Sequence, residues 1–251
     1  MLSIKEVSKH FGGLIALKNV SFNIEENRIH GIIGPNGSGK TTIFNCISGL
    51  LPVTSGNIFL DDLNITEKPA YEISKLGIRR TFQGADLVPS MTVVENVMSG
   101  IYNPQKSDII QTFFRKPFKK SDSEKELYNK AVETLKIFNI NDSAERWGSE
   151  LVWAERQLVQ IARAVISMPK VLLLDEPAAG LGNNETKQIG TIIKKIRDIG
   201  ITPVVVSHDM KMLMDTADYI TVLNFGEKIF EGSPEQAMKD SRVLEAYLGK
   251  E

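Results

Sequence analysis

Cysteine is nearly absent from this chain, and so are the long apolar runs that mark membrane proteins. The single cysteine, Cys46, cannot form a disulfide within the chain, so packing and hydrogen bonds must hold the fold. No segment approaches the roughly 18 to 20 apolar residues that a membrane-spanning helix needs. The first residues, MLSIKE, lack the basic start and apolar run of a secretory signal. We therefore expect a cytoplasmic protein that reaches a membrane only through a partner.

An excess of charge of one sign is also missing. The formal net charge is -1, from 30 basic and 31 acidic residues, so no global positive field favours nucleic acid. The guanine-reading sequence Asn-Lys-x-Asp does not occur, which argues against a GTPase. What the chain does have is 251 residues, 42% of them hydrophobic. That is enough for one large domain, or for a core with an inserted subdomain.

Apolar periodicity predicts short strands that alternate with helices, which indicates an α/β fold with a mixed or largely parallel sheet. Strands are expected at residues 2–7, 20–24, 28–33, 56–60, 78–82, 171–174 and 203–206, with a hairpin over 219–231. Helices are expected at residues 41–50, 70–76, 93–98, 124–138, 155–166 and 185–199. The alternation is interrupted by a mostly helical stretch. We therefore predict a single domain over 1–251, with a core of 1–83 and 161–251, a helical subdomain of 84–160 and a polar surface loop at 103–123.

The strongest chemical signal is the glycine-rich segment GPNGSGKT at residues 34–41, between a strand pattern and a helix pattern. Its glycines let backbone N–H groups turn toward phosphates, and the following helix directs its positive end at the same anion. Lys40 can reach the β- and γ-phosphates, and the Thr41 hydroxyl can ligate Mg²⁺. A plain glycine turn is the alternative, which the flanking elements disfavour. We assign nucleotide binding to Gly34, Asn36, Gly37, Ser38, Gly39, Lys40, Thr41 and Thr42.

A second signal lies after the apolar run 171–174, where Asp175 and Glu176 follow directly. We expect Asp175 to bind the nucleotide's Mg²⁺, directly or through water, and Glu176 to polarise the attacking water as the general base. Taken alone, four aliphatic residues and two acids are commonplace, and a strand-end turn would be the better interpretation. The phosphate loop earlier in the chain makes the catalytic hypothesis the better one.

Two further polar residues also follow strand patterns. His208 comes just after 203–206 and is a candidate contact for the γ-phosphate. Gln83 follows 78–82 and is a candidate for coordinating water or metal, beside Thr41 and Asp175. Each would be read as structural if it stood alone.

Together these residues resemble an ABC ATPase over essentially the whole chain. The segments that are similar to ATP-binding subunits of branched-chain amino acid importers are KHFGGLIAL (9–17), NCISG (45–49), RRTFQ (79–83), MTVVEN (91–96), DEPAAGL (175–181) and EGSPEQ (231–236) with AYLG (246–249). The resemblance implies a P-loop NTPase core of ABC type, an N-terminal antiparallel β subdomain and an inserted helical subdomain. It makes Gln83 the Q-loop glutamine, His208 the switch histidine and Phe11 the aromatic residue that stacks on adenine.

The same resemblance implies cofactors and partners. ATP and Mg²⁺ are the expected cofactors. The expected partners are membrane permease subunits, a second ATP-binding subunit paired head to tail and, indirectly, a periplasmic or extracellular solute-binding protein; no nucleic acid is expected. The chain would lie on the cytoplasmic face of the membrane and hydrolyse ATP to drive the uptake of branched-chain or related amino acids.

One segment departs from the family pattern. The signature of this branch is Leu-Ser/Ala-Tyr-Gly-Glu/Asp, whereas residues 151–155 read LVWAE. Val152 stands where a hydroxyl would donate to the partner's γ-phosphate, and Ala154 adds a methyl where the backbone should approach closely. Losing one donor to a transition-state phosphate costs about 3–4 kcal/mol. We therefore predict a weak half-site here, whereas a partner with an intact signature can complete the site built on Lys40.

Several alternatives remain beside the importer hypothesis. A soluble ABC ATPase that acts on ribosomes or DNA usually has two cassettes or a long coiled-coil insertion, and neither is present. A regulatory or weakly hydrolysing subunit that needs a second ATPase stays open. So does a transporter of urea or amide-type solutes.

Overall fold

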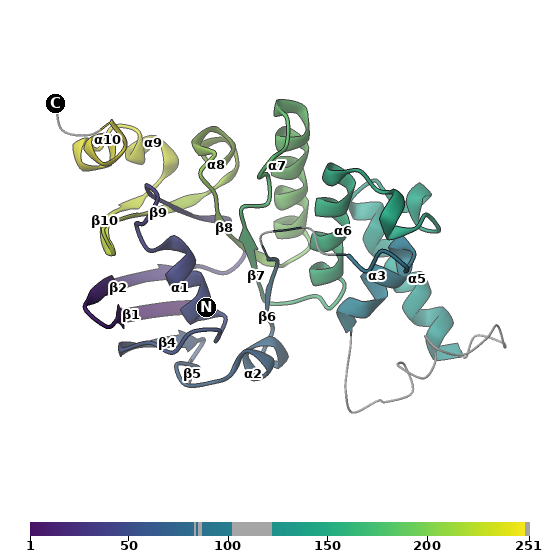
Figure 1. The fold of residues 1–251 in the computed structure, drawn as a ribbon, viewed down its shortest axis with the longest axis horizontal. Coiled ribbons are helices and arrows are strands. Elements are labelled where there is room, and N and C mark those ends of the chain that lie inside the picture. Colours follow the sequence, from purple (N-terminus) through teal and green to yellow (C-terminus); the bar gives the residue numbers. More distant parts are fainter. Residues whose placement is uncertain (83, 85–86, 102–121, 249–251) are drawn as a thin grey trace. The chain divides into compact units, whose positions relative to one another are not determined.

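The computed structural model describes residues 1–82, 84, 87–101 and 122–248. The chain divides into two compact units, one of Met1–Gln83 with Pro169–Glu251 and one of Gly84–Met168 (Figure 1). The second unit includes the whole of helix α6 (Trp153–Val165). The predicted boundary at residue 160 falls inside this helix. The smaller unit includes the rest of the helix and ends at Met168.

The first sheet of the larger unit is antiparallel, with the strand order β2-β1-β4-β5. This confirms the antiparallel N-terminal β region. The first two strands are longer than expected. Most of their additional residues are exposed and pair through their backbones, so they carry little of the apolar alternation that marks a strand. The strands are β1 (Leu2–Phe11), β2 (Leu14–Ile24), β4 (Ser55–Leu60) and β5 (Leu63–Asn64).

The second sheet is mixed, with the order β10-β9-β3-β8-β7-β6. Five of its strands run parallel, and only β10 is antiparallel to its neighbour. Every residue of β3, β7 and β8 is buried, which is why these strands appear in the sequence as continuous apolar runs. The strands are β3 (His30–Ile33), β6 (Ile78–Arg80), β7 (Val171–Asp175), β8 (Thr202–Val206), β9 (Tyr219–Asn224) and β10 (Glu227–Gly232).

A buried histidine lies inside this sheet. The Nε2 atom of His30 is 2.9 Å from the Thr221 hydroxyl oxygen on β9, and its ring stacks on Phe22 at 5.7 Å. Burial disfavours the charged ring and lowers the pKa of His30 to about 3. The neutral imidazole is therefore part of the core.

The larger unit has three helices that the sequence patterns did not predict, namely α8, α9 and α10. They have seven, four and eight residues, respectively. Helix α1 ends before the predicted residue 50, because Gly49 takes up a φ of +71°. Cys46 on α1 is buried, and burial raises the pKa of its thiol to about 11. The helices are α1 (Lys40–Ile47), α2 (Ala70–Lys75), α7 (Asn183–Asp198), α8 (Met210–Thr216), α9 (Pro234–Ala237) and α10 (Ser241–Leu248).

The described part of the smaller unit consists of helices and loops, with one isolated β-bridge between Thr92 and Trp147. Its core includes Val97, Leu135 and Ile161, which are fully buried. The expected surface loop at 103–123 lies outside the described residues except for its last two, which begin α5. No helix in the described part of the chain is long and apolar enough to cross a membrane. Besides α6, the elements are α3 (Val93–Met98), α5 (Asp122–Ile137) and the 3₁₀ turns Ser99–Ile101, Asn141–Ser143 and Gly148–Glu150.

Candidate functional site

Most of the residues expected to do chemistry follow parallel strands of the second sheet. Parallel strands present their carboxyl ends at one edge, where open α/β sheets bind ligands. The glycine-rich loop follows β3, Glu176 follows β7, and His208 lies just beyond β8. The fold therefore brings these groups to one edge. Gln83, expected beyond β6, lies outside the described residues.

The loop between β3 and α1 has a backbone that only glycine adopts readily. Gly34, Gly37 and Gly39 have φ angles of +155°, +78° and +102°. At Gly34 there is also no room, because an added Cβ would lie 2.1 Å from the carbonyl oxygen of Leu223. Gly39 is the N-cap of α1, and no side chain caps this helix. The first N–H groups of α1 thus face the loop without a side-chain acceptor.

Lys40 bends back into this loop. Its Nζ donates hydrogen bonds to the carbonyl oxygens of Gly34 and Pro35, at 2.7 and 2.9 Å. Burial lowers the pKa of Lys40 below its ordinary value, and the negative charge of Glu176 offsets only part of this decrease. The lysine is therefore buried, satisfied and directed into the concave side of the loop.

Ser38 provides a direct test of whether a phosphate fits. Its hydroxyl oxygen is buried and has no hydrogen-bond partner. A buried polar group without a partner costs about 1–3 kcal/mol, and a phosphate oxygen that accepts from this hydroxyl would remove the cost. Together with the uncapped start of α1, the orphan hydroxyl fits an anion held by the loop.

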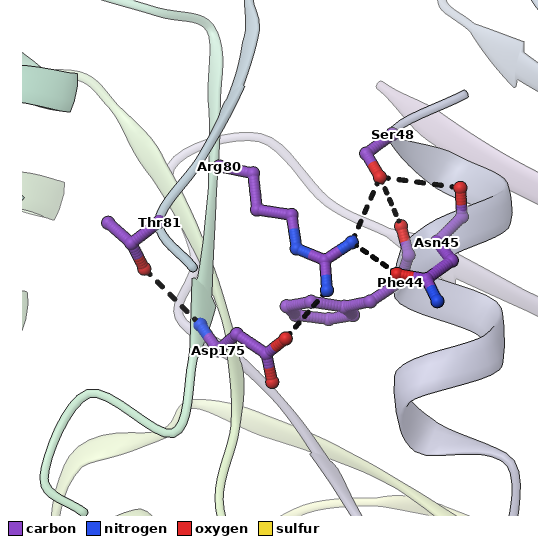
Figure 2. A network of polar contacts seen from close by, with 6 residues as sticks. All are labelled: Phe44, Asn45, Ser48, Arg80, Thr81 and Asp175. Atoms are coloured by element: carbon purple, nitrogen blue, oxygen red, sulfur yellow. Dashed lines mark hydrogen bonds and ion pairs between the residues drawn. The ribbon is translucent and has the colours of Figure 1, made fainter. Parts of the chain in front are cut away.

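Asp175 is the last residue of β7 and is only 6% exposed. Its Oδ2 accepts a hydrogen bond from Nη2 of Arg80 at 2.6 Å, and its backbone N–H donates to the Thr81 hydroxyl at 3.4 Å (Figure 2). Arg80 was not singled out in the sequence. The signal available in the sequence was a charged residue within a predicted strand, because a charge that is buried in a sheet requires a partner.

The structure brings Glu176 and His208 into contact. Glu176 has a φ of +49°, unusual for a residue with a side chain. Its Oε2 accepts from the backbone N–H of His208 at 3.2 Å and lies 2.7 Å from the ring Nδ1. The Glu176 side chain is 13% exposed and that of His208 is 69% exposed. The imidazole is therefore open to solvent, whereas the carboxylate is nearly buried.

A metal ion at this edge would need oxygen ligands from more than one source. The described residues contain no group of three or more histidine, cysteine or acidic side chains that could hold a metal alone. Asp175 and the hydroxyl of Thr41 at the start of α1 provide a carboxylate and an alcohol oxygen. Mg²⁺ typically takes one or two such ligands together with substrate phosphates. The donor set fits Mg²⁺ that arrives with a nucleotide.

Phe11 lies at the tip of the β1–β2 hairpin. It is 45% exposed, and the Lys9 ammonium lies 5.0 Å from its ring centroid. Strand β2 approaches the glycine-rich loop, because an added Cβ at Gly39 would lie 2.8 Å from the carbonyl oxygen of Ala16. An exposed aromatic face on this hairpin is available for stacking on a flat ring.

In the smaller unit, the segment LVWAE forms the turn into α6. Val152 is the N-cap and 64% exposed, with no side-chain cap. The turn is held by its neighbours instead. Glu155 accepts from the Val152 N–H at 3.1 Å and from Arg146 at 2.7 Å, and Arg156 donates to the Leu151 carbonyl at 2.9 Å. The helix therefore begins normally without the hydroxyl.

Comparison with known proteins agrees with this geometry. The family model for ABC transporters matches residues 17–179. BraF of Pseudomonas aeruginosa, a high-affinity branched-chain amino acid transport ATP-binding protein, is 36% identical, with 100% of this chain and 98% of BraF covered. The chain belongs to the ABC transporter family of ATP-binding proteins. A model for branched-chain amino acid ATP-binding cassette transporters also matches this ABC protein, at residues 227–251.

Solved cassettes share the fold of this ABC protein. The ADP conformation of MJ1267, an ATP-binding cassette of an ABC transporter, superposes with a TM-score of 0.85 at 31% identity, covering 100% of this chain and 99% of that one. A dimeric post-hydrolysis state of the cassette MJ0796, bound to ADP and phosphate, gives 0.74 at 30% identity, covering 93% and 99%. The α/β core, the antiparallel sheet and the helical region are those of an ABC ATPase, and such a cassette binds ATP.

Proposed function

We propose that this ABC ATPase hydrolyses ATP to energise the uptake of branched-chain or related amino acids. The observation that carries the proposal is the single sheet edge at which the loop of Lys40, the carboxylate of Glu176 and the ring of His208 meet. The relationship to BraF supports the choice of solute. The two compact units would together make one ABC ATPase domain.

Within this site, each residue has a proposed role. Lys40 and the backbone of the loop bind the phosphates, and Glu176 is the general base that polarises the attacking water. His208 contacts the γ-phosphate, and Phe11 stacks on adenine. Thr41, Asp175 and Gln83 would hold Mg²⁺, which neutralises phosphate charge when bound. The remaining phosphate contacts come from Gly34, Asn36, Gly37, Ser38, Gly39 and Thr42.

The proposed partners follow from the same relationship. Membrane permease subunits would receive the movement of the cassette through contacts near residues 84–100, and a second ATP-binding subunit would pair with it head to tail. A solute-binding protein would deliver the amino acid on the other side of the membrane, and nucleic acid would have no part. The chain would then lie on the cytoplasmic face of that membrane.

Lys40→Ala tests the assignment of the loop. The change removes the ammonium that points into the loop, so we expect tight binding of ATP with Mg²⁺ to be lost in titration calorimetry. Lys18→Ala is the matched control, because Lys18 is exposed and pairs with Glu227. Unchanged affinity in the Lys40 variant would show that the loop does not bind the nucleotide as proposed.

A further inference from the structure

Arg80, to which the proposed mechanism gives no role, lies at the centre of a polar network. Its Nη2 donates to Asp175 at 2.6 Å, and its Nη1 donates to the side-chain oxygens of Asn45 and Ser48 at 2.6 and 3.1 Å. Figure 2 shows the guanidinium between α1 and the end of β7, with contacts on both sides. One side chain therefore joins two separate elements of the site.

The position of this guanidinium is fixed by its surroundings. The side chains of Arg80 and Asp175 are each 7% exposed. The ring of Phe44 lies 5.6 Å from the guanidinium carbon, and the ring of Phe82 lies 5.4 Å from it. A delocalised cation packed near two aromatic rings and bonded at both terminal nitrogens has little freedom to move.

The two elements that Arg80 joins carry the two expected Mg²⁺ ligands of the described chain. Asn45 lies on α1, whose first turn contains Thr41, and Ser48 is the residue that directly follows this helix. Asp175 ends β7. Arg80 therefore links the helix that carries Thr41 to the carboxylate of Asp175.

We propose that Arg80 is a positioning residue for the Mg²⁺ site, because it fixes the Asp175 carboxylate relative to the start of α1. The proposal rests on the proposed function, which makes Asp175 and Thr41 the groups that hold the ion. Residues that orient metal ligands commonly change metal affinity by 10- to 100-fold when they are mutated. Arg80 itself contacts neither nucleotide nor metal in this role.

Only the fork of an arginine can fill this position. Asn45 and Asp175 are reached by different nitrogens of one planar group. Lysine has a single ammonium on a flexible stem, so it can satisfy one side while it loses the fixed geometry of both. Arg80→Lys therefore keeps the charge beside Asp175 and removes the connection.

The experiment measures ATP affinity of the full chain by calorimetry, once with excess Mg²⁺ and once with EDTA. For Arg80→Lys we expect the enhancement of ATP affinity by Mg²⁺ to fall by about tenfold or more, while the affinity in EDTA stays the same. Arg79→Lys is the matched control. Arg79 precedes it on β6 and donates to Ser74 of α2 instead, so the enhancement should be unchanged.

Asn45→Ala separates positioning from charge. This variant keeps the ion pair of Arg80 with Asp175 and removes one anchor on α1, so we expect a smaller loss of Mg²⁺ enhancement in the same direction. It also carries the test if Arg80→Lys does not fold. A lower melting temperature in either variant, with the Mg²⁺ enhancement intact, would mean that Arg80 is only structural and would overturn the proposal.

Asp175→Asn distinguishes the failure of this inference from failure of the proposed function. If Asp175→Asn leaves the Mg²⁺ enhancement unchanged, Asp175 does not hold the ion. The Mg²⁺ role that the proposed function gives to Asp175 and the positioning role of Arg80 then both fail. If Asp175→Asn abolishes the enhancement while Arg80→Lys and Asn45→Ala do not alter it, only the role of Arg80 is wrong. Loss in all three variants, with Arg79→Lys unaffected, is the expected result.

Discussion

Glu176 combines a left-handed backbone with a nearly buried carboxylate that His208 contacts. Glu176→Gln preserves the shape of the side chain and removes its basicity. We expect ATP binding to persist and turnover of the reconstituted transporter to fall by about a hundredfold or more, measured by phosphate release. Glu25→Gln, an exposed change on the same unit, should leave turnover intact. Undiminished turnover in the Glu176 variant would remove Glu176 from the role of base.

His30 makes the stability of the larger unit depend on pH. Its pKa is about 3 in the fold and about 6.5 in an unfolded chain, so the unfolded state binds more protons between these values. Stability is complete above pH 6.5 and decreases as the pH falls toward 3. At pH 5.5 the expected loss is about 1.4 kcal/mol relative to pH 7.5.

Urea unfolding of the wild type and of His30→Gln at both pH values tests this effect. Glutamine has no titrating ring, so the variant should lose less free energy of unfolding on acidification than the wild type. His10→Gln provides the control, because His10 is exposed at the end of β1. Equal pH dependence in the wild type and the His30 variant would contradict a neutral buried His30.

At the scale of elements, the start of α6 lacks the hydroxyl that commonly caps a helix. Glu155 already accepts from the Val152 N–H, so Val152→Ser would complete a reciprocal capping box. We expect the free energy of unfolding of the smaller unit to rise by about 1 kcal/mol, seen as a higher melting temperature. Val88→Ser, at an exposed position outside any helix, should give no such gain. A gain of equal size in both variants would exclude capping as the cause.

The elements that the sequence predicted are those with strong periodicity or complete burial. Strands β7 and β8 lie within one residue of their predicted bounds because every residue in them is buried. Helices α8 and α9 were missed because each has seven residues or fewer, too few for a 3.6-residue repeat to be distinct. Length alone does not explain the outcome, because α2 and α3 have six residues each and were predicted.

The residues of the candidate site also fall into two groups, those that the sequence could indicate and those that only the structure shows. The loop of Lys40 is contiguous in sequence, so it could be proposed from its spacing, and this loop in turn made the adjacent pair Asp175 and Glu176 a candidate. The contact of Arg80 with Asp175 joins residues 95 positions apart and depends on β6 pairing with β7. No local pattern encodes such a pairing, so only the fold could show it.

At the scale of the whole molecule, the segment LVWAE predicts unequal sites in an assembled pair of subunits. Val152 cannot donate a hydrogen bond, and Ala154 adds a methyl where close approach is expected. If two identical chains pair, both sites should turn over slowly. We expect Val152→Ser with Ala154→Gly to raise the turnover of the chain alone, measured as steady-state phosphate release.

A different second subunit changes the expected outcome. If that subunit has an intact signature, normal turnover should appear only when it is added, and the double change should mainly activate the other site. Brisk hydrolysis by the unmodified chain, unaffected by the double change, would show that these residues do not limit a half-site.

Cys46 is the only thiol in the chain, and it is buried on the helix that follows the phosphate loop. A thiol with a pKa near 11 has almost no thiolate at neutral pH, and the thiolate is the reactive form. The natural sequence therefore has no reactive thiol that would compete with a cysteine introduced for site-specific labelling. A cysteine placed at an exposed position of either unit would accept a fluorophore or spin label while Cys46 stays unmodified, so that the movements of the two units can be followed without first removing a native residue.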